Sequence, residues 1–177
     1  AYLFKGTPFQ IISNLEDIDH IDYHQHLLSL PGIYFNETNG FEKNINYINI
    51  NQTNDKSWKQ KLSTYKKPVI AINWQGDHRY TYDDMRSIPL SYFNDTLNNE
   101  NFEFISLQKN FGSEQIKKNN FENLLIDFSK EIDSGENAFE DTISILKNVE
   151  CVITSDTAIA HLAGTLNVKT FLLLAFN

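Results

Sequence analysis

The stretch 151–177, CVITSDTAIAHLAGTLNVKTFLLLAFN, limits the folds open to this chain more than any other segment. Its apolar runs at 151–154 and 170–175 predict two strands that are buried on both faces. Between them, the small apolar residues of 158–163 predict a helix that can pack closely on a sheet. Two buried strands joined by a helix favour a right-handed parallel βαβ unit.

The loop between the first of these strands and the helix is a candidate site. Ser155, Asp156 and Thr157 are helix-capping residue types, and in a βαβ unit this loop faces the ligand crevice. The N–H groups at a helix start attract anions, phosphate above all. His161 would project from the same helix face as Thr157. An ordinary capped helix with a half-buried, hydrogen-bonded His161 accounts for the same local pattern, so both interpretations stay open here.

Length, charge and metal-ligand content exclude several classes of function. The 177 residues suffice for one α/β domain, or for one domain with part of another. The net charge of -8 disfavours nonspecific binding to nucleic acid or anionic membranes. The single Cys151 and the two-residue spacing of His24 and His26 predict no disulfide and no metal site. No apolar run approaches the ~20 residues of a membrane span, and no signal peptide is visible, so we expect a cytoplasmic protein.

Residues 1–66 hold isolated elements and not a complete domain. A strand predicted at 9–13 has no neighbour to pair with, and the segment 24–30 is expected to end at Pro31 and Gly32. We interpret 1–66 as the remnant of an N-terminal domain and a linker.

Two further elements are expected before the main domain. The segment 36–57 predicts a short edge strand or an extended linker. The segment 55–65 predicts a helix that is capped by Asp55, because Trp58 and Leu62 recur at helical spacing.

Residues 67–177 alternate strictly between strand and helix patterns, without a hairpin signal. Strands are predicted at 69–74, 102–107, 124–127, 151–154 and 170–175, and helices at 88–97, 112–118, 139–148 and 158–163. This alternation predicts an α/β fold with a doubly wound, parallel, Rossmann-like sheet of strand order 3-2-1-4-5. We expect the domain to be incomplete at its C-terminal end, because a last parallel strand usually needs a helix to cover it.

This topology brings two polar loops to one crevice. Strands one and four are neighbours at the point where the strand order reverses, and ligands bind there in open α/β sheets. The loops that follow these strands are 74–77 and 155–157. Their convergence favours a ligand site over the purely structural interpretation of the second loop.

The motifs in this order resemble a glycosyltransferase family. The segments VIAINWQGD, RSIPL and FEFISLQ, followed by 151–177, resemble the C-terminal half of the group related to lipopolysaccharide heptosyltransferases, which is often fused behind tetratricopeptide repeats. The earlier HQHLLSLPGIYF resembles the end of that family's N-terminal domain. The resemblance implies one half of a GT-B fold, in which two Rossmann-like domains enclose the active site. It also implies sugar transfer from a nucleotide-sugar donor, with no required metal and no cofactor.

The resemblance assigns residues to the donor site. Asp156, Thr157 and His161 match a D-T-x-x-x-H motif whose helix start holds the donor diphosphate, and Trp74 to Gly76 match a W-x-G loop that faces phosphate and sugar. The residues implied for diphosphate and sugar are Ser155, Asp156, Thr157, His161, Trp74, Gln75, Gly76 and Arg79. The nucleoside is expected beside Leu107 and Gln108 of an S-L-Q motif.

Sugar transfer needs N–H or O–H groups that stabilise the leaving diphosphate. The Thr157 hydroxyl, the helix N–H groups and Arg79 could supply them. The catalytic base for the acceptor hydroxyl is unknown and is expected outside this chain, because Asp156 suits a cap or a sugar contact better.

The functional hypothesis is therefore a hexosyl- or heptosyltransferase-like glycosyltransferase, present as a fragment that is inactive alone. Its partners would be a nucleotide-sugar donor and a saccharide or protein acceptor, and unpaired strand edges would permit self-association. The alternatives are a noncatalytic nucleotide-binding module and a ligand-free interaction domain on the same scaffold.

Overall fold

The structure is a computed structural model that describes residues 3, 5, 7, 10–12, 14–26, 29–38 and 47–175. The chain divides into two compact units, Ala1–Asn49 and Ile50–Asn177. No helix among the described residues is both long and apolar enough to cross a membrane.

The first unit contains a short 3-10 helix, η2 (Leu15–Asp17), and the helix α1 (Leu30–Thr38). Pro31 and Gly32 lie in the first turn of α1, so the prediction that they end an element is wrong. Proline is tolerated there because its missing N–H has no acceptor in the first turn and its φ is already helical.

Two strands predicted in this region are not formed where the structure can be described. Of the strand expected at 9–13, residues 10–12 have no regular structure, and Phe9 and Ser13 lie outside the described residues. Of the edge strand or extended linker expected at 36–57, residues 36–38 belong to α1, and 39–46 lie outside the described residues. Residues 47–50 form no strand and agree with the linker alternative.

The second unit begins with α2 (Gln52–Leu62), which starts earlier than predicted. The side chain of Asn51 caps it by accepting hydrogen bonds from the N–H groups of Thr53 and Asn54. Asp55, the predicted cap, instead accepts from side chains of Lys147 and Asn148. Lys147 and Asn148 directly follow α6 (Glu140–Leu146), so these hydrogen bonds connect α2 to that helix. The two helices also pack against each other. The compact unit thus starts at Ile50, and the assignment of 1–66 to another domain stays a prediction.

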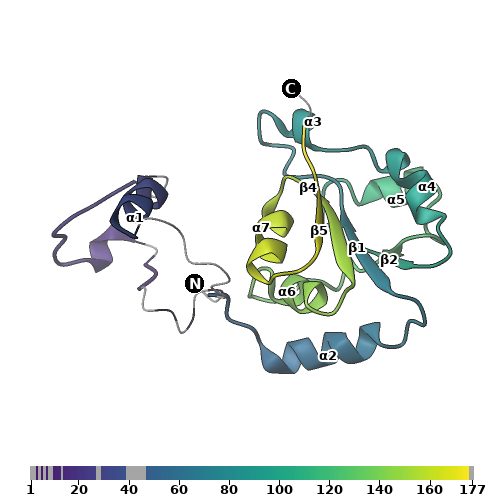
Figure 1. Cartoon of the computed structure of the whole chain (residues 1–177), viewed down its shortest axis with the longest axis horizontal. Helices are drawn as coiled ribbons and strands as arrows, with labels where there is room; N and C mark the ends of the chain where they lie inside the picture. The colour runs from purple at the N-terminus through teal and green to yellow at the C-terminus, as the bar shows by residue number, and fades with distance from the viewer. Residues whose placement is uncertain are drawn as a thin grey trace. The chain divides into compact units, whose positions relative to one another are not determined.

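Five strands form one parallel sheet in the order β3-β2-β1-β4-β5, as predicted (Figure 1). The strands are β1 (Val69–Asn73), β2 (Glu103–Ser106), β3 (Ile126–Asp127), β4 (Cys151–Ser155) and β5 (Thr170–Leu173). Each neighbouring pair is parallel. The Rossmann-like fold class is therefore confirmed.

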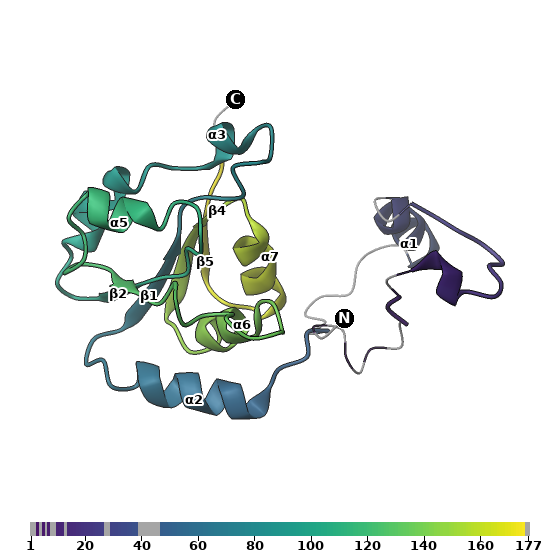
Figure 2. The same ribbon diagram turned by 180° about the vertical axis from the view of Figure 1, so that it is seen from behind.

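Helices cover both faces of the sheet (Figures 1 and 2). Two short helices, η4 (Leu90–Phe93) and α4 (Asn94–Leu97), replace the single helix predicted at 88–97 and lie on one face with α5 (Glu114–Lys118). On this face, alternate β1 residues pack against them in a core that includes Ile72, Trp74 and Leu90. The other face carries α6 and α7 (Ala158–Thr165). The segment 75–87, which follows β1, contains one further short helix, α3 (Asp83–Arg86).

Candidate functional site

The carboxyl ends of β1 and β4 lie side by side, since Asn73 pairs with Thr154. A cavity of about 480 Å³, here called the switch-point cavity, opens at this edge of the sheet. The sequence-predicted residues that line it are Gln75, Gly76, Arg79, Leu107, Gln108 and Thr157. The structure therefore brings together side chains from the ends of β1, β2 and β4, as the predicted topology requires.

A buried asparagine joins β1 to the start of α7. The Oδ1 atom of Asn73 accepts hydrogen bonds from the hydroxyls of Thr157 at 2.9 Å and Thr154 at 3.3 Å. Thr157 is the N-cap residue of α7, but its side chain accepts no hydrogen bond from the helix N–H groups, and its hydroxyl donates to Asn73 instead. Thr157, Ala158 and Ile159 all line the cavity. The positive end of the α7 dipole thus faces the cavity without a side-chain cap.

Gln108 holds the ends of β1 and β2 together. Its Oε1 atom accepts from the Asn73 side chain and from the N–H groups of Trp74 and Gln75, at 2.9, 3.2 and 3.0 Å. Its Nε2 atom donates to the carbonyls of Gln75 and Phe111. Both amide atoms are therefore committed to the protein, and the side chain fixes the shape of the cavity. The nucleoside contact expected of Gln108 stays a prediction.

Arg86 is a cavity residue that sequence reasoning placed in a motif but not in the site. Its Nε atom donates to Asp83 at 3.0 Å, and its Nη1 atom donates to the carbonyl of Asp156 at 3.2 Å. The side chain thereby ties the segment after β1 to the loop after β4. The only sequence signal for this role was the arginine of the RSIPL motif.

Two other basic residues line the cavity, and both are tethered. Arg79 donates to the carboxylate of Asp77 and holds the pKa of that carboxyl well below its usual range. Lys109 donates to the carbonyls of Ile132 and Asp133. Arg79, Lys109 and Arg86 against one carboxylate, Asp77, give the lining an excess of positive charge.

Gly76 is required by the close approach of Arg86. A Cβ atom at this position would lie 2.6 Å from Asp83 Oδ1 and closer still to the Arg86 guanidinium. The Gly76 N–H also donates to the hydroxyl of Ser87. Any larger residue at position 76 would have to displace the ion pair between Asp83 and Arg86.

Four sequence-predicted site residues do not line the cavity. Trp74 is fully buried in the core, where its indole N–H donates to the carbonyl of Gly112. Ser155 is also fully buried, and its hydroxyl has no hydrogen-bond partner among the described residues. Asp156 and His161 are exposed. Binding roles for these four side chains stay predictions.

Neither a family model nor a curated protein matches the chain. The fold and its switch-point cavity are those of a Rossmann-like α/β domain. Among solved structures, the chain is similar to the ADP-heptose LPS heptosyltransferase II of E. coli, with a TM-score of 0.51 and 10% sequence identity. The match covers 70% of this chain and 38% of the heptosyltransferase chain. At this identity the likeness shows the fold alone, and it supports the glycosyltransferase fold that the sequence resemblance implies.

Proposed function

We propose that the chain is a donor-binding part of a glycosyltransferase and that the switch-point cavity holds a nucleoside diphosphate sugar. The uncapped start of α7 carries this proposal, because it presents backbone N–H groups to a cavity lined by basic side chains. A helix start of this kind is a ready site for phosphate groups. The fold shared with a heptosyltransferase supports the same class of reaction.

The diphosphate would lie against the N–H groups of Ala158 and Ile159, with Arg86 at its side. These donors would stabilise the negative charge that develops on the leaving diphosphate during transfer. The Thr157 hydroxyl donates to Asn73, and its contact with the diphosphate stays a prediction. We therefore expect the backbone N–H groups that follow Thr157, and not its hydroxyl, to bind the phosphate.

The nucleoside would occupy the apolar part of the same cavity. Leu107, Phe111 and Phe139 line it, and aromatic rings offer flat apolar surface on which a base can stack. The sugar would pass to a saccharide or protein acceptor, and the catalytic base would come from elsewhere in the full enzyme. This part of the proposal follows the resemblance and the partial coverage of the similar structure.

Calorimetric titration of ADP, GDP and UDP into the chain tests the proposal. Thr157→Val should bind the nucleotide as the wild type does, because it keeps the backbone N–H groups. Thr157→Asp should bind about tenfold more weakly, because its carboxylate repels the diphosphate. Thr53→Asp adds the same charge to the first turn of α2 and should leave the affinity unchanged. Failure of all three nucleotides to bind the wild type would contradict the proposal.

A further inference from the structure

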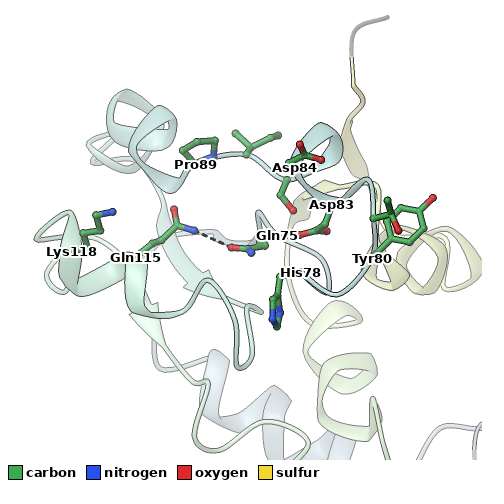
Figure 3. Close-up of a pocket in the computed structure, with 11 residues that line it drawn as sticks. Gln75, His78, Tyr80, Asp83, Asp84, Pro89, Gln115 and Lys118 are labelled. Carbon is green, nitrogen blue, oxygen red and sulfur yellow. Dashed lines mark hydrogen bonds between the residues drawn. The ribbon is translucent and has the colours of Figure 1, made fainter.

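A second cavity, of about 620 Å³, lies between the segment 75–89 and α5 and is here called the α3–α5 cavity (Figure 3). We propose that it binds the hydroxyl groups of an uncharged saccharide. That this saccharide is the acceptor rests on the proposed function. The α3–α5 cavity shares a wall with the switch-point cavity, differs from it in charge and is lined by groups that can bind hydroxyls.

The two cavities are separated by a thin partition. Gln75 lines both of them. His78 lines the α3–α5 cavity, and its ring lies 3.7 Å, centroid to centroid, from the ring of Phe111, which lines the switch-point cavity. Ligands in the two cavities would therefore be neighbours, as the two substrates of a group transfer must be.

The two cavities differ in charge. The switch-point cavity carries Arg79, Arg86 and Lys109 against one carboxylate, Asp77, whereas Asp83 and Asp84 line the α3–α5 cavity against one ammonium, that of Lys118. Asp83 is buried and paired with Arg86. Asp84 is exposed, and no hydrogen bond or ion pair is recorded for it among the described residues, so its carboxylate remains available to a ligand. A carboxylate repels phosphate and accepts hydrogen bonds from hydroxyls, which favours an uncharged ligand here.

The other groups suit a sugar as well. Gln115 donates to Gln75 Oε1 at 3.1 Å, as the dashed line in Figure 3 shows, and this hydrogen bond fixes the Gln75 side chain. The Gln75 amide nitrogen makes no hydrogen bond with the described residues and can donate to a ligand. The half-exposed ring of Tyr80, held by the guanidinium of Arg86 at 4.7 Å, gives an apolar face. Donor, acceptor and ring thus converge on one cavity from α5 and from the segment after β1. Small-ligand sites combine apolar surface with a few placed polar groups in this way.

The test is a chemical-shift titration of the 15N-labelled 177-residue chain with the methyl glycosides of glucose, galactose, mannose and N-acetylglucosamine. At least one glycoside should shift the Gln75 and Gln115 side-chain amides and the backbone of Asp84. Asp84→Ala should weaken that binding about tenfold, because a hydrogen bond to a charged group is lost. Asp95→Ala removes an acidic side chain of α4 that does not line the cavity, and it should leave the affinity unchanged.

Any of three results would overturn the inference. No glycoside shifts a signal, the shifts are confined to the switch-point cavity, or Asp84→Ala binds the glycoside as tightly as the wild type. The mapping on wild-type chain keeps the test decisive even if Asp84→Ala does not fold. A parallel titration with ADP, GDP and UDP separates this inference from the proposed function. Glycoside binding without nucleotide binding would support the saccharide site and contradict its role as the acceptor site. Nucleotide binding without glycoside binding would support the proposed function and overturn the saccharide site.

Discussion

The two loops that meet at the switch-point cavity are built in opposite ways. The segment after β1, here called the braced loop, is held by side-chain interactions: the hydrogen bonds of Gln108 and Ser87 and the ion pair of Asp83 and Arg86. The loop after β4 is held mainly at Thr157 and at the carbonyl of Asp156, and the helix that follows starts without a side-chain cap. The braced loop sets the shape of the cavity, and the open helix start supplies its free N–H groups.

Replacing Gln108 should damage the braced loop most. Gln108→Ala removes five hydrogen bonds and leaves buried N–H and C=O groups without partners. We expect the free energy of unfolding to fall by about 3 kcal/mol, because each buried unsatisfied group costs roughly 1–3 kcal/mol. Urea denaturation followed by circular dichroism measures this.

The matched control is Gln60→Ala on the exposed side of α2, which should change the stability by no more than about 0.5 kcal/mol. Similar losses of unfolding free energy in the two variants would show that the Gln108 side chain does not stabilise this loop.

In the second test, adding a methyl group should have opposite effects on stability in the segment after β1 and in the helix that follows β4. Gly76→Ala places a Cβ atom against Asp83 and Arg86 and should destabilise the fold by about 1–3 kcal/mol through overpacking. Gly164→Ala lies in α7, where a Cβ atom meets nothing within 4 Å, and should stabilise by about 0.5–1 kcal/mol through the better helix propensity of alanine. Thermal denaturation compares the two melting temperatures, and a shift of the same sign in both would contradict the contrast.

The smallest effect is expected at the exposed rim of the braced loop. Hydrogen bonds from Arg79 lower the pKa of Asp77 from its ordinary 3.8, so Asp77 stays ionised in acid where a free aspartate would bind a proton. Any stability that this pair adds is present above the ordinary pKa and is lost as the pH falls through the lowered one. Arg79→Ala removes the side-chain hydrogen bonds and keeps the backbone one, so it should raise the pKa of Asp77 part of the way to its usual range. No measurable loss of stability is expected at neutral pH, because exposed ion pairs contribute little.

A carbon NMR titration of the Asp77 carboxyl in both proteins checks this. An unchanged Asp77 pKa in the variant would mean that Arg79 does not hold this carboxylate.

The sequence predicted the order of the sheet because buried parallel strands leave long apolar runs between polar loops. It also predicted that the loops after β1 and β4 converge, since that follows from the strand order. Local patterns could not show which side chains reach the crevice. Trp74 belongs to a site motif, yet strand alternation carries it into the core with Ile70 and Ile72.

The partners that build the site are far apart in the chain, which is why the sequence did not reveal them. Gln108 acts on residues 33 to 35 positions away, and Arg86 reaches a carbonyl 70 positions away. The cap of α2 was misplaced for a local reason. Both Asn51 and Asp55 are capping types, and only the backbone shows that Asn51 precedes the first turn.

The burial of Trp74 has a practical consequence for spectroscopy. The chain has 2 tryptophans, and their surroundings differ. Trp74 lies in the dry core and donates to Gly112, next to Phe111 on the cavity wall, whereas Trp58 lies between Asp141 and the ammonium of Lys61. With Trp58 replaced by phenylalanine, the tryptophan emission of the chain, excited where its 8 tyrosines do not absorb, would come from Trp74 alone. Its fluorescence would then report, without any added dye, on every movement of the loop that carries Phe111.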